Sequence, residues 1–167
     1  MDALRTQFRD AMSRLGAAVN IITTAGPAGR AGFTASAVCS VTDDPAMLLV
    51  CVNRSSRAYP YVIQNGVMCV NVLGGPHRPV SDSFAGFTTT TMDERFGTGS
   101  WTVLSTGAPA LEGASAAVDC VIEDVVEKNG QKQFTVGFAE RTLDDLAGLD
   151  DGYDDERPFA AVARASE

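Results

Sequence analysis

Residues 32–41 read Gly-Phe-Thr-Ala-Ser-Ala-Val-Cys-Ser-Val, and this stretch is the most informative about the fold. It belongs to a series of short apolar or β-branched runs, which are typical of strands. Turn-forming residues separate several runs, and Asn129-Gly130 between two of them is a strong hairpin signal. Six strands at this spacing predict a mainly β fold, a closed or nearly closed antiparallel barrel. The runs are Ala18 to Thr24, Gly32 to Val41, Met47 to Asn53, Val67 to Leu73, Ala116 to Val126 and Gln133 to Glu140.

Four segments outside these runs have helical patterns. From Leu4 to Leu15, apolar residues recur at helical spacing with arginines between them, which predicts an amphipathic N-terminal helix lying on an apolar surface. Arg57 to Gln64 is a second candidate, because Asn65-Gly66 follows it as a helix stop. Ser81 to Phe87 and Met92 to Phe96 are expected to form two short peripheral helices.

The composition fits one globular domain. The chain has 167 residues, 45% of them apolar and 20% charged, which is enough to bury a core and excludes global disorder. The length predicts a single domain over residues 1–167. A net charge of −8 without a basic cluster argues against nucleic acid, and no apolar run reaches the roughly 20 residues that cross a bilayer. Charges within Met1 to Arg9 argue against a signal peptide, so we expect a cytoplasmic protein without a membrane partner.

Few side chains suit acid-base catalysis or metal binding. The single histidine, His77, lies in a Gly/Pro-rich stretch, which favours a solvated loop over a zinc site or a nucleophilic triad. The four cysteines lack C-x-x-C spacing and lie inside apolar runs, so we interpret them as small buried residues and expect no metal. They are Cys39, Cys51, Cys69 and Cys120.

The negative charge is concentrated near the C-terminus. From Thr142 to Glu156 the chain has seven acidic residues and no basic one, so the rest of the sequence is almost neutral. We interpret this segment as a solvated loop or short helix. A docking surface for a basic partner is the alternative.

Two polar clusters are the candidates for a binding site. One runs from Gly32 to Ala37, with Ser40 beyond it, and the other is Asn53-Arg54-Ser55-Ser56-Arg57. Small side chains let the backbone approach a flat ligand, while hydroxyls, free N–H groups and arginines suit phosphate oxygens. The same residue types are common at strand ends and helix caps, so the pattern leaves both ligand binding and a purely structural role open.

Taken together, the motifs resemble the short-chain flavin reductases, the small components of two-component flavin monooxygenases such as 4-hydroxyphenylacetate 3-monooxygenase. The resemblance covers roughly residues 8–126 and is most specific over Gly32 to Val41. It implies a split β-barrel that binds FMN or FAD, usually as a homodimer with the flavin sites near the subunit interface. Further matching segments are Phe8 to Met12, Ala18 to Thr24, Leu49 to Asn53, Asn65-Gly66, Cys69 to Leu73, Phe84 to Gly86, Glu94 to Phe96 and Leu111 to Gly113.

The resemblance also implies three flavin-binding segments. The first would line the isoalloxazine ring and the ribityl chain, the second would be the loop on the phosphate side, and the third would close over the flavin. Phe84 in the third segment is equally compatible with a core aromatic. In this order the segments contain Thr34, Ala35 and Ser36, with Ser40 nearby; Asn53, Arg54, Ser55 and Ser56; and Phe84 and Ala85.

The implied function is an NAD(P)H:flavin oxidoreductase. NADH or NADPH would reduce FMN or FAD, and the reduced flavin would diffuse to a partner flavin-dependent monooxygenase. One departure concerns the nicotinamide side, where family members carry a His and this chain has Gln133, which donates a hydrogen bond but cannot become cationic. The segment Arg157 to Arg164 is also only a faint match. The alternative hypothesis is a flavin-binding or flavin-free protein of the same fold, recruited to another biosynthetic reaction.

Overall fold

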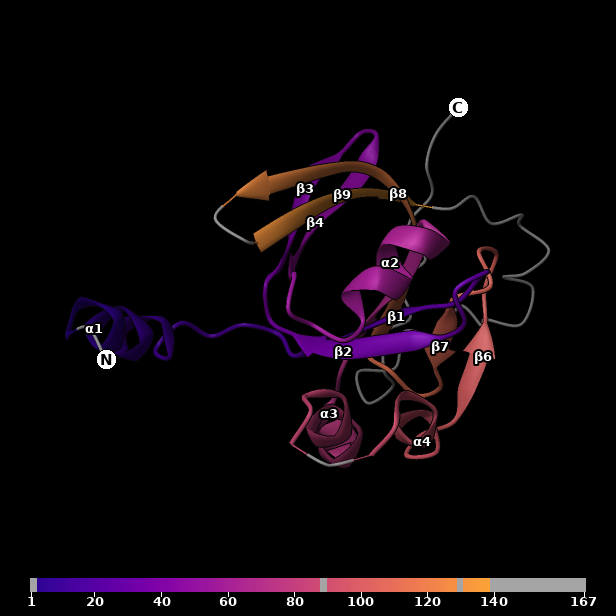
Figure 1. Ribbon diagram of the computed structural model, residues 1–167, viewed down its shortest axis with the longest axis horizontal. Helices are drawn as coiled ribbons and strands as arrows, with labels where there is room; N and C mark the ends of the chain where they lie inside the picture. The colour runs from indigo at the N-terminus through magenta and orange to yellow at the C-terminus, as the bar shows by residue number, and fades with distance from the viewer. Residues whose placement is uncertain (1–2, 88–89, 129–130, 139–167) are drawn as a thin grey trace, which may run out of the picture.

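The computed structural model describes residues 3–87, 90–128 and 131–138, the last of these by its backbone. Seven strands form one antiparallel sheet in the order β2-β1-β5-β8-β9-β4-β3, and β6 and β7 form a second, small sheet (Figure 1). The strands are β1 (Asn20–Thr24), β2 (Ala31–Ala35), β3 (Val38–Asp43), β4 (Ala46–Asn53), β5 (Val67–Val72), β6 (Trp101–Val103), β7 (Pro109–Leu111), β8 (Ala116–Lys128) and β9 (Gln131–Phe138).

The large sheet curls because its two edge strands are consecutive in the chain. In a flat sheet, six strand spacings would separate β2 from β3 by about 29 Å. Only Ser36 and Ala37 connect them, and three Cα steps from Ala35 to Val38 span at most about 11 Å. The sheet therefore bends until both edges meet at this corner, with β3, β4, β8 and β9 above β1 and β2 in Figure 1. No ladder joins β2 to β3 among the described residues, so the edges stay unpaired.

Two apolar clusters cover opposite faces of β1. Ile22 points into the curl, where it meets Val50, Met68 and Val70. Ile21 points to the other side, where it packs with Phe84 and Phe96 under the helices. β1 is buried along its whole length, and its sequence Asn-Ile-Ile-Thr-Thr accordingly shows no alternation of apolar and polar residues.

Helices cover the sheet on both sides of the corner. α2 (Tyr59–Asn65) contributes Val62 to the inner cluster and ends at Gly66, whose φ of +68° gives the left-handed cap that the sequence predicts. A short 3₁₀ helix, η1 (Gly75–His77), leads into α3 (Arg78–Phe84). Both α3 and α4 (Met92–Phe96) lie against β2, below it in Figure 1.

The N-terminal helix α1 (Ala3–Met12) forms as predicted but does not lie on an apolar surface of the described chain. It projects away from the sheet in Figure 1 and has no buried residue. Phe8 is 63% exposed and Met12 45% exposed, so the described chain leaves much of this apolar stripe accessible to solvent. The periodicity predicted the stripe correctly, but it carries no information about which molecule covers it.

A buried amide ties the two sheets together. Asn71 of β5 is fully buried, and its Nδ2 donates to the backbone oxygen of Ile21 in β1 at 3.0 Å. Its Oδ1 accepts from the backbone N–H of Leu111 in β7 at 2.7 Å. Thr23 Oγ1 of β1 also donates to the backbone oxygen of Pro109 in β7. Both β1 and β5 are therefore hydrogen-bonded to the small sheet.

The predicted strands are largely confirmed, with two differences. The run Gly32 to Val41 is not one strand, because Ser36 and Ala37 interrupt it at the corner. β6 and β7 were not predicted, since three-residue strands are too short to show a period. The strands flanking Asn129-Gly130 are antiparallel neighbours with Lys128 opposite Gln131, as the hairpin signal predicts, although the turn residues themselves lie outside the described ones.

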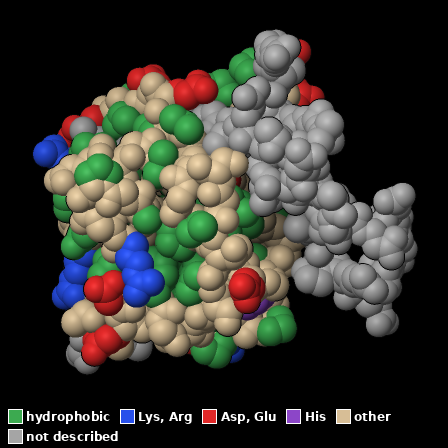
Figure 2. All heavy atoms as spheres, turned by 90° about the vertical axis from the view of Figure 1, so that its right-hand side faces the viewer, with side chains coloured by type: hydrophobic (Ala, Val, Ile, Leu, Met, Phe, Trp, Pro, Cys, Tyr) green, Lys and Arg blue, Asp and Glu red, His purple; other side chains and the backbone are tan. Residues whose placement is uncertain are grey.

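The described surface carries few charged groups on the face shown in Figure 2, where green apolar and tan neutral atoms predominate. This agrees with the near-neutral charge of the sequence outside Thr142 to Glu156, a segment that lies beyond the described residues. Over the described part of the chain, none of the helices combines the length and the apolarity that crossing a bilayer requires.

We expect Gly32→Ala to destabilise the fold, because a Cβ at residue 32 would lie 2.7 Å from Cε1 of Phe84 and 3.0 Å from the backbone oxygen of Ile22. The Phe84 ring cannot easily yield, since Phe96 and Trp101 pack against it. Overpacking of this kind costs roughly 1–3 kcal/mol, so the melting temperature should fall in calorimetry. Gly75→Ala is the matched control, because no atom lies within 4 Å of its Cβ position. Equal melting temperatures for the two variants would contradict this account.

Candidate functional site

A pocket lies at the corner where β2 leads into β3. It has a volume of about 470 Å³, which is within the range of ~300–1,000 Å³ for small-molecule sites. Three segments line it: the β2–β3 corner, the end of β4 with the loop to α2, and the region from the end of α3 to α4. The curl of the sheet and the helices on β2 therefore create the site together.

The corner supplies small side chains and one structural hydroxyl. Ala35 is half-buried, while Ser36 and Ala37 are exposed, and all three line the cavity. Thr34 Oγ1 donates to the backbone oxygen of Ser81 at 2.7 Å, so this hydroxyl fastens β2 to α3. The small residues add little bulk to the cavity. The hydrogen bond of Thr34 holds α3 in place beside them.

The loop after β4 is shaped by its own side chains. Asn53 Oδ1 accepts from the backbone N–H of Ser55 at 2.9 Å and from Ser55 Oγ at 2.8 Å. Ser56 Oγ accepts from the backbone N–H of Ala58 at 3.3 Å, just before α2. These local bonds are typical of Asx and ST turns, and they hold the loop in the conformation that borders the pocket.

Phe84 and the two residues after it form the opposite wall. Phe84 is only 1% exposed and makes an edge contact with Phe96 at 5.1 Å between ring centroids. It also lines the cavity, together with Ala85 and Gly86. The two roles left open by the sequence therefore coexist, since the core aromatic is also a wall of the pocket.

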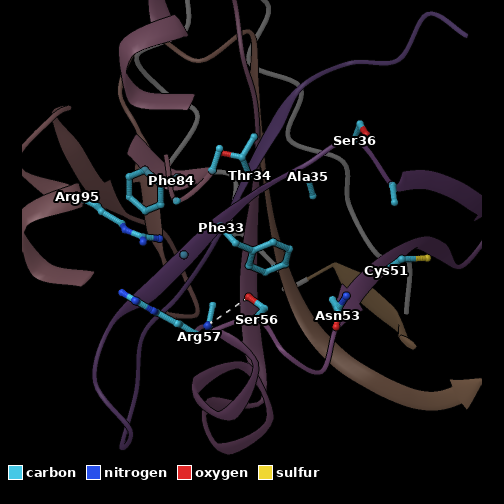
Figure 3. Close-up of a pocket in the computed structure, with 15 residues that line it drawn as sticks. Phe33, Thr34, Ala35, Ser36, Cys51, Asn53, Ser56, Arg57, Phe84 and Arg95 are labelled. Atoms are coloured by element: carbon cyan, nitrogen blue, oxygen red, sulfur yellow. Dashed lines mark hydrogen bonds between the residues drawn. The ribbon is translucent and has the colours of Figure 1, made fainter. Parts of the chain in front are cut away.

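Two arginines lie at one end of the pocket. Arg95, from α4, is buried, and its Nε has no hydrogen-bond partner within the described chain. Arg57, from the loop before α2, is exposed and lies at the same end, whereas Ser36, Cys51 and Asn53 lie at the other end (Figure 3). Burial lowers the pKa of the Arg95 guanidinium, and the charge of Arg57 lowers this pKa further.

The structure brings most of the sequence-predicted flavin residues to this one cavity. They come from three separate segments of the chain, and the curl places them together. The predicted residues that line it are Thr34, Ala35, Ser36, Asn53, Ser56, Phe84 and Ala85.

Ser40, Arg54 and Ser55 are not placed at the cavity. Ser40 lies in β3, past the corner, and is exposed. Arg54 Nη1 donates to Glu127 Oε1 at 2.6 Å, which directs its charge toward β8. Ser55 donates to Asn53, as described above. Other residues of the same segments line the cavity, but alternation along the strand and local turn bonds direct these three side chains elsewhere.

Gln133 lies in β9 with its Cα directly opposite Cys51 of β4, a residue that lines the pocket. The backbone thus brings Gln133 next to the site, while its side chain lies outside the described atoms. The segment Arg157 to Arg164 lies outside the described residues altogether.

Sequence reasoning missed the roles of Arg95 and Cys51. Arg95 falls in the matching motif Glu94-Arg95-Phe96, and that match was the one available signal. The prediction that all four cysteines are buried is wrong for Cys39, which is exposed, and for Cys51, which is half-buried at the pocket. Burial raises the pKa of the Cys51 thiol and nearby Cys39 raises it further, so Cys51 stays a neutral thiol near pH 7.

Nothing in the described site is arranged for acid-base or metal chemistry. His77 Nδ1 accepts from the backbone N–H of Gly74 at 3.2 Å, so the histidine stabilises the η1 turn and does not line the pocket. Among the described residues, no three His, Cys, Asp or Glu side chains gather as metal ligands would.

Comparison with known proteins shows the family of the chain. Residues 12–143 match the family model described as the flavin reductase like domain. The chain is 62% identical over 116 residues to the FMN reductase (NADH) RutF of Variovorax paradoxus strain S110, covering 70% of this chain and 63% of that protein. It is 57% identical over 143 residues to the protein of the same name from Cronobacter turicensis, covering 85% of each chain.

A solved structure points the same way. A candidate flavin reductase from Haemophilus somnus 129PT superposes with a TM-score of 0.78 at 41% identity, over 84% of this chain and 87% of that one. A family model that spans most of the chain, close relatives and a shared fold agree. The chain therefore belongs to the flavin reductase like domain family.

Proposed function

We propose that this chain is an NAD(P)H:flavin oxidoreductase that supplies reduced flavin to a partner monooxygenase. The observation that carries the proposal is the pocket itself, which combines small walls with two arginines and lacks acid-base groups. The names of the relatives support FMN as the flavin and NADH as the reductant. The resemblance of the motifs to two-component systems supports the monooxygenase partner.

The residues present fit a flavin. Ala35, Ser36 and Ala37 add little bulk to the cavity that they line. Within the described chain, the Nε of Arg95 is a buried donor without a partner, which suits an anionic ligand. When bound, the flavin supplies the redox chemistry, taking a hydride from C4 of a dihydronicotinamide at its N5 atom. The task of the protein is to hold two flat rings at reacting distance and to exclude water.

Individual residues take the following roles in this proposal. Thr34 fixes α3 through Ser81, so Phe84 and Ala85 close one side of the flavin. Asn53 shapes the loop that presents Ser56. Gln133, whose Cα lies opposite that of Cys51, would border the nicotinamide on the side of β9. No proton needs to be stored on a side chain, because hydride transfer moves both electrons together.

We also propose a split β-barrel for the sheet, within a single domain of residues 1–167. The meeting of β2 and β3 at a two-residue corner supports a barrel-like closure, and the unpaired edges support its split form. The free cysteines of the described chain are compatible with a reducing, cytoplasmic location.

A homodimer is supported by two apolar surfaces that the described chain leaves exposed. On β8, Ile122 and Val125 join the core, while Val121 and Val126 remain 43% and 49% exposed. Helix α1 exposes a second apolar stripe, and an isolated helix of ten residues is not stable in water without a partner. A second copy of the chain would cover both surfaces. It would also lie near the pocket, because Cys51, which lines the pocket, belongs to the adjoining part of the sheet.

The first prediction concerns activity. We expect the purified protein to bind FMN and to oxidise NADH only when flavin is added, at a rate well above that of NADH with free FMN. Loss of absorbance at 340 nm measures this. FMN binding without NADH or NADPH oxidation would reject the reductase and favour the non-reductase alternative.

The second prediction concerns the small-residue wall. Ser36→Leu adds bulk inside the pocket, and we expect FMN affinity to fall by about fivefold or more, as overpacking of roughly 1–3 kcal/mol implies. Ser36 is exposed, so the melting temperature should not change. Ser105→Leu, at an exposed serine outside the pocket, is the control for fluorescence titration with FMN. Equal FMN affinities for the two variants would show that Ser36 does not contact the flavin.

The third prediction concerns assembly. We expect sedimentation equilibrium to give twice the 17.5 kDa of one chain. The double variant Val121→Asp with Val126→Asp should shift the mass toward the monomer, because it places charges on the buried face of the dimer. Val103→Asp, also exposed but on β6, should remain dimeric. A monomeric wild-type chain would refute the homodimer.

A further inference from the structure

One backbone N–H at the edge of the large sheet is satisfied by a methionine sulfur. β2 is an edge strand, and among the described residues no strand pairs with its outer side. Gly32 is buried in this strand, and its N–H donates to Sδ of Met92 at 3.4 Å. A thioether is a weak acceptor, so this contact depends on the chemical state of a single sulfur atom.

This contact between nitrogen and sulfur joins two walls of the pocket. Gly32 lines the cavity, and its Cβ position would lie 2.7 Å from the ring of Phe84, so the wall is closely packed there. Met92 is the first residue of α4, and Arg95, one helical turn later, lines the cavity from the same helix. A change at the sulfur therefore acts on β2 and on α4 together.

The side chain of Met92 can be reached from solvent. Met92 is only half-buried, whereas Met68 in the inner core is fully buried. The next residue, Asp93, has a side chain that is 79% exposed, which places the start of α4 at the surface. Peroxides convert an accessible thioether to a sulfoxide, which is polar and larger. Met92 thus combines access for an oxidant with a contact that oxidation would change.

We propose that Met92 is an oxidation site for hydrogen peroxide, and that its sulfoxide weakens flavin binding. One peroxide oxygen forms the S–O bond as the O–O bond breaks, and the other oxygen leaves as water. The sulfur loses two electrons, which the peroxide gains. The source of peroxide rests on the proposed function: reduced FMN that meets O2 before a monooxygenase passes it two electrons and two protons, giving FMN and hydrogen peroxide. The site would slow a reductase whose product is not consumed.

Sulfoxide formation disturbs the contact between β2 and α4 in either of two ways. A distance of 3.4 Å between the Gly32 nitrogen and the sulfur has no room for an added oxygen atom. The sulfoxide oxygen therefore either pushes α4 away from β2 or turns aside and leaves the buried N–H of Gly32 unpaired, which is costly. We expect FMN affinity to fall roughly threefold to tenfold, the equivalent of about one hydrogen bond.

The test treats the purified protein with hydrogen peroxide in the absence of flavin and then measures FMN affinity by fluorescence titration. Peptide mass mapping should show one added oxygen atom on Met92, and FMN affinity should fall as the modified fraction rises. Treatment with both methionine sulfoxide reductases should restore the affinity, because together they reduce both epimers of the sulfoxide. Treatment with their reductant alone is the control, since it reverses only thiol oxidation.

Two variants identify the residue responsible. Met92→Leu conserves the volume and cannot form a sulfoxide, so its FMN affinity should be the same before and after peroxide treatment. Met47→Leu is the matched control, because Met47 is also half-buried but does not line the pocket. This control retains Met92 and should lose as much FMN affinity on peroxide treatment as wild type does.

Three results would overturn the oxidation site. The first is a Met92 that peroxide leaves unmodified, and the second is an unchanged FMN affinity once Met92 is oxidised. The third is a loss of affinity that persists in Met92→Leu, which would assign the effect to another side chain, such as the exposed thiol of Cys39. If Met92→Leu fails to fold, repair of the wild-type protein by the sulfoxide reductases decides.

A separate measurement tests the source of the peroxide. With NADH and FMN in air and no monooxygenase, Met92 sulfoxide should accumulate during turnover, and catalase should prevent this. Sulfoxide that accumulates equally with catalase would overturn the role of peroxide. Absence of NADH oxidation would reject the reductase itself, while the result with added peroxide would still decide the oxidation site.

Discussion

The whole architecture depends on a two-residue connection between strands at opposite edges of one sheet. Ser36 and Ala37 force β2 and β3 together, and the sheet has to bend through its full width to allow this. The bend creates an inner core around Ile22 and leaves a corner that none of the described side chains fills. The pocket is a consequence of this closure, because a corner built from Ser and Ala cannot occupy the space that it encloses.

Much of the fold could be predicted because the sheet is built from long apolar runs that are separated by clear turn and helix-cap signals. Gly66 ends α2 and the strands beside Asn129-Gly130 pair as the residues indicate. The break at Ser36 was not predictable from periodicity, since Ser and Ala fit a strand as well as a corner. The exposure of α1 was not predictable either, because an amphipathic stripe specifies that something covers it and not which surface does.

The sequence indicated which segments meet at the pocket better than it indicated which of their side chains face it. The sequence identifies the three segments that meet, but Arg54 and Arg57 are three positions apart and point to different places, one to Glu127 and the other to the pocket. Which of the two arginines faces the pocket depends on the turn that Asn53 stabilises, and this turn is seen only in the structure. Gly32 shows the same limit, because the close approach predicted for a ligand is taken up by the ring of Phe84.

The aromatic cluster under β2 has an optical consequence. The chain has one tryptophan, Trp101, and its ring centroid lies 5.5 Å from that of Phe84, which is itself a wall of the pocket. The indole is held by a 2.8 Å hydrogen bond from its Nε1 to the backbone oxygen of Phe96. The protein therefore contains a single indole fluorophore, held by this hydrogen bond and one side chain away from the pocket. Its emission overlaps the absorption of an oxidised flavin, so the native chain is its own energy-transfer donor for an occupied pocket.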